Sequence, residues 1–253
     1  MDTTRSTHKR RLAALLAAVP LMAACGSDHG TDSGLRTAGA RPMTSRGTQL
    51  VITTDNGVRL RPADGDRATA DRHIRGRWTH QGDTWVLSLS CPAGTDSGRQ
   101  CPRMPEVDVP AGSSVSVSAR NAGIDVAGVS ATLDLATVNG DVTVTRSGER
   151  DGTVRLASRN GSVRAQALRA ARLHAETVNG DLVLGCAGSP QHVRAATTNG
   201  SVRVTVPQDA PAYRVSARTD NGRPTVSVPT AGRTEGRGMT LTTVNGDVTA
   251  LHE

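Results

Sequence analysis

The six residues TVNGDV occur at Thr137–Val142 and again at Thr243–Val248, and the variant TVNGDL lies between them at Thr177–Leu182. They belong to a longer series of Asn-Gly pairs, which begin at Asn56, Asn139, Asn160, Asn179, Asn199, Asn221 and Asn245. Counted from Asn121, where Ala122 interrupts the pair, successive copies are 18 to 24 residues apart. Self-similarity with a period of about 20 to 25 residues is typical of solenoids and other repeat architectures.

Both flanks of the Asn-Gly pair alternate between apolar and polar residues. The sixth and fourth residues before each Asn are apolar, as at Leu133 and Leu135. In most copies the third and fifth residues after it are apolar, as at Val142 and Val144. Alternation with period 2 indicates strands with one buried face. Each copy therefore predicts two half-buried strands that meet at the Asn-Gly pair.

Two architectures fit this alternation. In an antiparallel meander, Asn-Gly would form a type I′ hairpin turn. In a β-solenoid it would form a corner, and successive coils would stack about 4.7–4.9 Å apart. The second residue before Asn is Thr or Ser in seven of eight copies, which a meander does not require.

Stacked coils explain the recurring residues. Each Asn amide and Thr hydroxyl could bond to its counterpart in the neighbouring coil, and Gly would supply a positive-φ corner. We therefore expect an all-β fold, a β-solenoid of about eight coils with Asn-Gly corners. The expected ladder residues are Thr137, Asn139, Gly140, Ser158, Asn160, Gly161, Thr177, Asn179, Gly180, Thr197, Asn199, Gly200, Thr219, Asn221, Gly222, Thr243, Asn245 and Gly246.

The N-terminus carries a targeting signal. Four basic residues precede an apolar run at Leu12–Ala24, which is too short to span a bilayer, since about 20 residues are needed. The run ends in LMAAC at residues 21–25, which resembles the lipobox of bacterial lipoprotein signal peptides, with Met22 where Leu is usual. The resemblance implies cleavage before Cys25 and acylation of that residue, with palmitate-type chains. An ordinary secretory signal is the alternative.

Three segments are expected along the chain. Residues 1–24 form the lipoprotein signal peptide, residues 25–47 the lipidated cysteine with a flexible Gly- and Ser-rich linker, and residues 48–253 the strand-repeat domain. More than one acyl chain gives stable anchoring, whereas a single chain binds only reversibly. The expected location is therefore the extracytoplasmic face of the bacterial cell membrane, with the lipid anchor holding the protein there.

Three cysteines follow Cys25. Cys91 and Cys101 flank a short turn-rich loop, and outside the cytosol we expect them to form a disulfide. Cys186 is left over. A small buried side chain is more typical of such a residue than a reactive thiol.

The net charge does not indicate a nucleic-acid partner. Without residues 1–24 the formal charge falls from +7 to +4, and the whole chain has two Trp, one Tyr and no Phe. Few aromatic rings are thus present to stack on bases. Nucleic-acid binding is not expected.

Carboxylates follow Asn-Gly at Asp141, Asp181 and Asp247, and β-helix folds include polysaccharide-cleaving enzymes. Along the chain this position reads Asp, Ser, Asp, Ser, Arg, Asp. Two coils would separate the first two carboxylates by about 9.5 Å, which is wide for a glycosidase pair, and the alternation avoids like charges in neighbouring coils. His174, His192 and His252 share no metal-ligand spacing. We expect no catalytic residue, metal or cofactor.

The tandem T-x-N-G-[DS]-V phrase and VDVPAG at Val107–Gly112 resemble a family of bacterial envelope proteins, the putative adhesins with Gly-rich β-strand repeats. The resemblance covers about residues 47–253 and implies a right-handed single-stranded β-helix without established catalytic residues. Arg223-Pro224 departs from the usual acidic–apolar pair, which predicts a bulge or irregular coil there.

The expected function is a lipid-anchored cell-envelope protein with a structural, adhesion or surface-binding role and no catalysis. Its expected partners are the membrane and an envelope protein or polysaccharide. Two alternatives stay open: a polysaccharide- or cell-wall-active β-helix enzyme, and an accessory protein of an envelope sensor or transporter. The sequence names neither a ligand nor an oligomeric state.

Overall fold

The computed structural model describes residues 41–42, 48–72, 74–90, 104–231 and 236–253. They belong to a unit spanning residues 35–253, and a second unit at residues 1–34 lies outside the described part. All regular elements among the described residues are β-strands, in one sheet of ten strands and one of eleven. The prediction of an all-β fold is confirmed.

The strands follow one another along the chain as β1 (Arg41–Pro42), β2 (Gln49–Thr54), β3 (Val58–Pro62), β4 (Arg67–Ala70), β5 (Arg75–Gln81), β6 (Thr84–Ser90), β7 (Glu106–Val109), β8 (Ser114–Ala119), β9 (Ile124–Ala127), β10 (Thr132–Asn139), β11 (Val142–Thr145), β12 (Thr153–Asn160), β13 (Val163–Leu168), β14 (Arg172–Glu176), β15 (Leu182–Cys186), β16 (His192–Ala196), β17 (Val202–Val206), β18 (Arg214–Asn221), β19 (Pro224–Val226), β20 (Gly238–Asn245) and β21 (Val248–His252).

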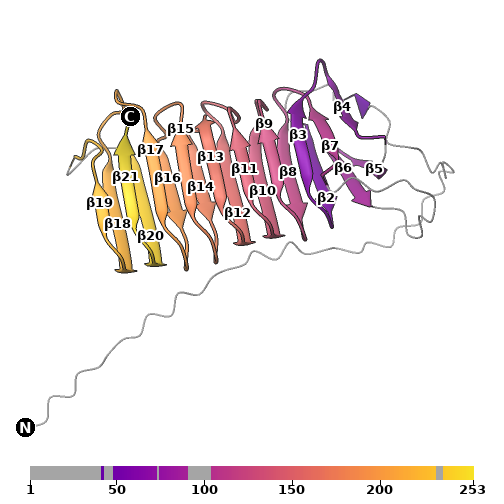
Figure 1. Ribbon diagram of the computed structural model, residues 1–253. Coiled ribbons are helices and arrows are strands. Elements are labelled where there is room, and N and C mark those ends of the chain that lie inside the picture. Colours follow the sequence, from indigo (N-terminus) through magenta and orange to yellow (C-terminus); the bar gives the residue numbers. More distant parts are fainter. Residues whose placement is uncertain (1–40, 43–47, 73, 91–103, 232–235) are drawn as a thin grey trace, which may run out of the picture. The chain divides into compact units, whose positions relative to one another are not determined.

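At each Asn-Gly pair the chain passes from one sheet to the other. β10 ends at Asn139 in the ten-stranded sheet, and β11 begins at Val142 in the eleven-stranded sheet. β12 then returns beside β10, in parallel and in register, so that Asn160 lies next to Asn139. Asn-Gly is thus a corner between sheets and not a hairpin turn. The antiparallel meander is excluded, and the repeat region is a solenoid-like stack of windings (Figure 1).

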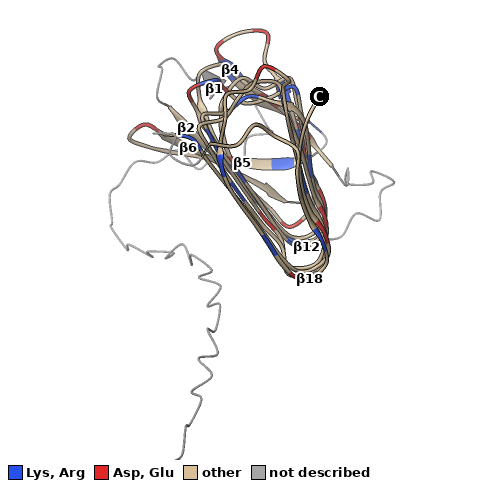
Figure 2. Cartoon of the chain, turned by 90° about the vertical axis from the view of Figure 1, so that its left-hand side faces the viewer, with Lys and Arg blue, Asp and Glu red and all other residues tan. Residues whose placement is uncertain are grey.

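The described residues form one hydrophobic core, which lies between the two sheets. Leu133 and Leu135 of β10 and Val142 and Val144 of β11 are at most 1% exposed, and the same positions are buried in the neighbouring windings. Burying one such aliphatic side chain stabilises the fold by about 1.5–3 kcal/mol. Figure 2, which views the stack from the β18–β19 end, shows the two sheets facing each other. The apolar alternation in the sequence therefore marks the core-facing positions.

The windings do not stack in chain order at the C-terminal end. β20 pairs with β16 on one side and with β18 on the other, and β21 lies between β17 and β19. The expectation that each coil stacks on the preceding one is therefore wrong here. The winding that contains Pro224 occupies the end of the stack, where a residue without an N–H is tolerated because no further strand needs the donor. Arg223-Pro224 thus marks an edge and not a bulge.

The N-terminal end is also reordered. β2 lies between β6 and β8, and β3 lies between β7 and β9. Beyond this inserted winding the strands are antiparallel: β5 pairs with β6, β4 with β7, and β1 with β4. No Asn-Gly repeat occurs in residues 58–90, so the repeat pattern gave no sign of these antiparallel strands.

The corner glycines permit a very close approach between windings. A Cβ added to Gly161 would meet the carbonyl oxygen of Gly140 at less than 3.0 Å, closer than real Cβ atoms come, and the equivalent holds at every corner from Gly140 to Gly246. A positive φ accompanies this at Gly180, Gly200 and Gly246 but not at the other three corners. Close stacking is therefore the shared reason for Gly, and the expected positive-φ requirement applies to only half of the corners.

Gly161→Ala tests the stacking requirement, because φ at this residue is not positive. We expect the free energy of unfolding to fall by about 2–3 kcal/mol, since the added methyl group must displace the backbone of the neighbouring winding. The measurement is chemical denaturation. Gly188→Ala is the matched control, because no atom lies within 4 Å of its added Cβ, and it should change stability by less than about 0.5 kcal/mol. Equal effects of the two substitutions would contradict the stacking requirement.

Candidate functional site

A column of asparagine side chains runs along the corners. The Nδ2 of Asn160 donates to Oδ1 of Asn139 at 2.9 Å, and Asn179 donates to Asn160 at the same distance. The column continues through Asn199, Asn245 and Asn221 in that spatial order, with donor–acceptor distances of 2.8–2.9 Å. The structure thus brings all six predicted ladder asparagines together, in the order of the stack and not of the chain.

The threonines of the repeat do not form a second column of hydroxyl–hydroxyl bonds, contrary to the expectation from sequence. Thr177 is 6% exposed, and its Oγ1 donates to the carbonyl oxygen of Gly161 at 2.8 Å. The other hydroxyls at this position in the windings from β10 onward make the equivalent bond, and the donors are Thr137, Ser158, Thr197, Thr219 and Thr243. A corner carbonyl facing the core would be costly if it had no donor. The hydroxyl is therefore required for the corner carbonyl beside it, which also explains why Ser serves as well as Thr.

The corner carboxylates bind backbone amides. Oδ1 of Asp181 accepts from the backbone N–H of Ser201, and the backbone N–H of Asp181 donates to Oγ of Ser162. The same pattern links Asp141 to Ser162 and Asp247 to both Ser201 and Arg223. In spatial order this position alternates between Asp and Ser from Asp141 to Asp247, because the C-terminal winding is inserted before Arg223. The carboxylates thus act as structural acceptors, one per alternate winding.

A network of charges lies on the outer face of the ten-stranded sheet. Arg155 of β12 contacts Glu176 of β14 at 2.9 Å and Asp134 of β10 at 3.9 Å, and His174 lies 3.7 Å from Glu176. Burial raises the pKa of the Asp134 carboxyl above its usual value, although Arg155 opposes this. Burial also lowers the pKa of the His174 imidazole below 6.5, and the Glu176 carboxylate opposes that shift. His174 is therefore largely neutral at neutral pH.

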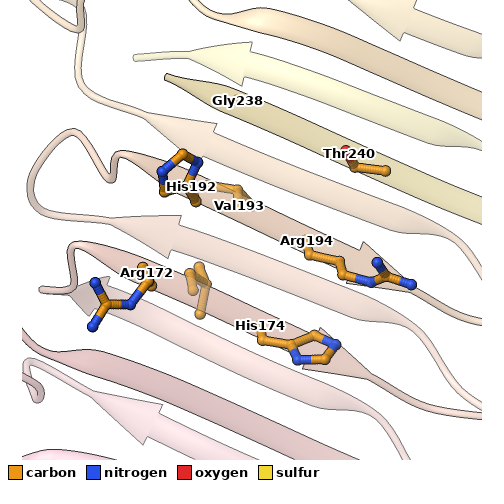
Figure 3. A pocket seen from close by; sticks show the side chains of 8 residues that line it. Arg172, His174, His192, Val193, Arg194, Gly238 and Thr240 are labelled. Carbon is orange, nitrogen blue, oxygen red and sulfur yellow. The ribbon is translucent and has the colours of Figure 1, made fainter. Parts of the chain in front are cut away.

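Next to this network the surface forms a shallow basic depression of about 290 Å³ over β14, β16 and β20. Arg172 and His174 come from β14, and His192 and Arg194 from β16; Arg172 pairs in register with His192, and His174 with Arg194 (Figure 3). Gly238 pairs in register with His192 from the other side and has no side chain to fill the surface there. We call this site the basic depression. Its groups can bind an anion, but none of the described residues that line it is a carboxylate able to act as a catalytic base.

The sequence did not predict the basic depression. Its two histidines, His174 and His192, have no spacing along the chain that suggests a shared site. Gly238 reaches His192 only because β20 is inserted beside β16, and that insertion is not visible in the repeat pattern. The outward positions of β14 and β16 do alternate with buried residues, which could have indicated the basic side chains on one face.

The predicted lipidation site Cys25 and the predicted disulfide pair Cys91 and Cys101 lie outside the described residues. Cys186 is a free thiol in the structure, and burial raises its pKa to about 12. A thiol with so high a pKa is not in the reactive thiolate form at neutral pH. In the described part of the chain no group of three or more His, Cys, Asp or Glu could hold a metal ion, and no helix is suited to cross a membrane.

Comparisons with known proteins place the chain in a family. The Toastrack DUF4097 family model matches residues 106–250, more than half of the chain. Among solved structures, a putative cell adhesion protein from Clostridium sporogenes ATCC 15579 is 10% identical, with a TM-score of 0.39, over 85% of this chain and 100% of its own. A putative adhesin from Bacteroides fragilis NCTC 9343 is 14% identical, with a TM-score of 0.44, over 86% and 98%. No curated protein matches. The chain belongs to the Toastrack DUF4097 family, and the family resemblance drawn from its Asn-Gly repeat is thereby confirmed.

Proposed function

We propose that this protein is a lipid-anchored envelope protein with a structural and adhesive role and no catalysis. Cys25 is its lipid anchor on the extracytoplasmic face of the bacterial cell membrane, residues 25–47 form the linker, and residues 48–253 form the binding domain. A disulfide between Cys91 and Cys101 belongs to this proposal, since that location is oxidising. The windings number about eight and are right-handed, as connections between parallel strands almost always are.

The use of the corner carboxylates is the observation that carries the non-catalytic role. The acids at 141, 181 and 247 are the best enzyme candidates in the sequence, and each accepts a hydrogen bond from the backbone of the next winding. One carboxylate oxygen of each acid is thereby engaged by the backbone of the neighbouring winding, whereas a general acid or base must reach a proton of the substrate. These residues are suited to keeping the corners regular.

The basic depression supports adhesion to an acidic polysaccharide of the envelope. The side chains of Arg172 and Arg194 extend from adjacent strands and are exposed (Figure 3). Arginine binds carboxylate and phosphate groups in a fixed fork geometry. The spacing between strands repeats along the sheet at about 4.8 Å, so a linear polymer could contact several windings at once. Such repeated weak contacts give avidity without a deep pocket.

The lipid anchor is tested with Cys25→Ala in the native bacterium. We expect the variant to leave the membrane fraction, because the thiol that carries the acyl chains is gone and no other lipid anchor is proposed. The measurement is immunodetection of the chain in membrane and soluble fractions. Cys186→Ala serves as the control and should stay with the membrane. A Cys25→Ala variant that sediments with the membrane as fully as the wild type would contradict the anchor.

Binding to an acidic polysaccharide is tested with polygalacturonate as the probe. Replacing both Arg172 and Arg194 by Gln should weaken binding roughly tenfold, since two charge-assisted contacts are lost. The control replaces Arg159 and Arg203 by Gln, because both are exposed outside the basic depression. It changes the net charge by the same amount and should leave the dissociation constant within about twofold of the wild-type value. The wild type should bind more tightly near pH 5 than near pH 7.5, because a bound anion favours the protonated form of His174. The measurement is isothermal titration calorimetry.

Two results would oppose this proposal. If the two control substitutions weaken binding as much as those in the depression, attraction is a general charge effect and not a property of the site. If polygalacturonate is shortened during the titration, with new reducing ends, the polysaccharide-active enzyme alternative is favoured instead.

A further inference from the structure

In the described part of the chain the two sheets end in four edge strands, and only β18 is both long and of mixed charge. The edges of the eleven-stranded sheet are β1, with two residues, and β19, with three, the first of which is Pro224. The ten-stranded sheet ends in β5 and β18. β5 contains Arg75 and Arg77 and no acidic residue. Short strands, proline and like charges are the usual protection of a sheet edge against pairing with another chain, and β18 has none of them.

The core-facing side of β18 is incompletely covered. Val215 and Ala217 pack against the core but are only partly buried. Their counterparts in the inserted winding, Met239 and Leu241, are at most 1% exposed. The difference arises because, among the described strands, β20 has a neighbour on both sides, β16 and β18, whereas β18 has a neighbour only on the β20 side (Figure 1). Apolar side chains therefore lie at the open end of the stack, next to a strand edge beside which the described residues place no further strand.

The direction of those backbone groups follows from two hydrogen bonds. The N–H of Arg214 donates to the carbonyl of Arg237, toward β20, whereas the N–H of Tyr213 donates to the carbonyl of Pro229, on the opposite side. Backbone groups of successive strand residues point to alternate sides. Val215, Ala217 and Thr219 therefore direct their N–H and C=O groups to the open edge.

We propose that the open edge of β18 pairs with β18 of a second copy of this chain, antiparallel about a two-fold axis at Ala217. In this register Ala217 lies opposite Ala217 of the other copy, and Val215 lies opposite Thr219. These are the residues whose backbone groups face outward, so each pair exchanges two backbone hydrogen bonds. A two-fold axis closes the assembly at two copies.

Charge complementarity selects this register. Arg214 and Asp220 are exposed on the outer face of β18, and an axis at Ala217 places each opposite the other across the interface. Directly opposed unlike charges stabilise a strand pair, whereas opposed like charges destabilise it. Moving the axis by one residue, to Ser216 or Arg218, would bring arginines opposite each other. The pairing also covers Val215 and Ala217, so the core continues from one copy into the other.

The test uses the full-length chain in a mild detergent, with the protein mass per particle measured by sedimentation across concentration. We expect two copies per particle, with a dissociation constant on the order of micromolar, because pairing at one edge strand gives a small interface. Arg214→Asp should weaken dimerisation roughly tenfold or more, since it opposes like charges twice. Adding Asp220→Arg to it should restore the dimer by reversing both charges.

Arg203→Asp is the control for net charge, because Arg203 is exposed on the inner strand β17. It should leave the dimer unchanged. Hydrogen exchange gives an independent readout: the amides of Val215, Ala217 and Thr219 should be protected in the wild type and exchange faster in Arg214→Asp. A monomeric wild type, a larger open assembly, or equal weakening by Arg203→Asp would overturn the proposal. So would protection of these amides in a monomer, which would mean that another segment of the chain covers the edge.

Discussion

The close approach of successive windings at the Asn-Gly corner is the constraint on which the other contacts depend. Gly leaves no Cβ between one corner and the carbonyl of the next. That approach brings the hydroxyl of Thr177 to the carbonyl of Gly161 and the amide of Asn179 to its counterpart in the neighbouring winding. Each residue of the T-x-N-G-D phrase therefore has a separate structural role, in which Thr satisfies a carbonyl, Asn extends a column, Gly allows contact and Asp accepts a backbone N–H. Scaffolding accounts for the repetition.

The reordered C-terminal winding follows from the same constraint. The winding of β20, whose corner is TVNGDV, has every feature of the repeat. It lies inside the stack, so β20 pairs with a neighbouring strand along both of its edges. The winding with Arg223-Pro224 lacks the acidic–apolar pair and occupies the end. This order keeps Asp247 next to Ser201 and so preserves the alternation of acid and hydroxyl. It also places Gly238 beside His192, so that the basic depression and the open β18 edge are both products of one change in stacking order.

Much of the fold was predictable because every copy of the repeat has the same apolar alternation and the same polar residues at its corner. Alternation indicated the strands and the core positions such as Leu133 and Val142, and the recurring Thr and Asn distinguished stacked windings from hairpins. The order of windings was not predictable, since every copy presents the same local pattern and any two can stack. The antiparallel strands near β5 lack the repeat, and the irregularity between Ala165 and Leu168, with Ala167 at a φ of 52°, has no sequence signal. The basic depression depends on that order, which explains why the sequence did not predict it.

The stacking order at the Asn column tests this account most directly. The measurement is nuclear Overhauser contacts between side-chain amides in the full chain, with Asn199 observed selectively. With the winding of β20 inserted, Asn199 should show contacts to Asn179 and to Asn245, and none to Asn221. A direct contact between Asn199 and Asn221 would contradict the inserted winding. Antiparallel backbone contacts between Leu135 and Val144, as in a hairpin, would contradict the stacked windings altogether, because β10 pairs in parallel with β8 and β12.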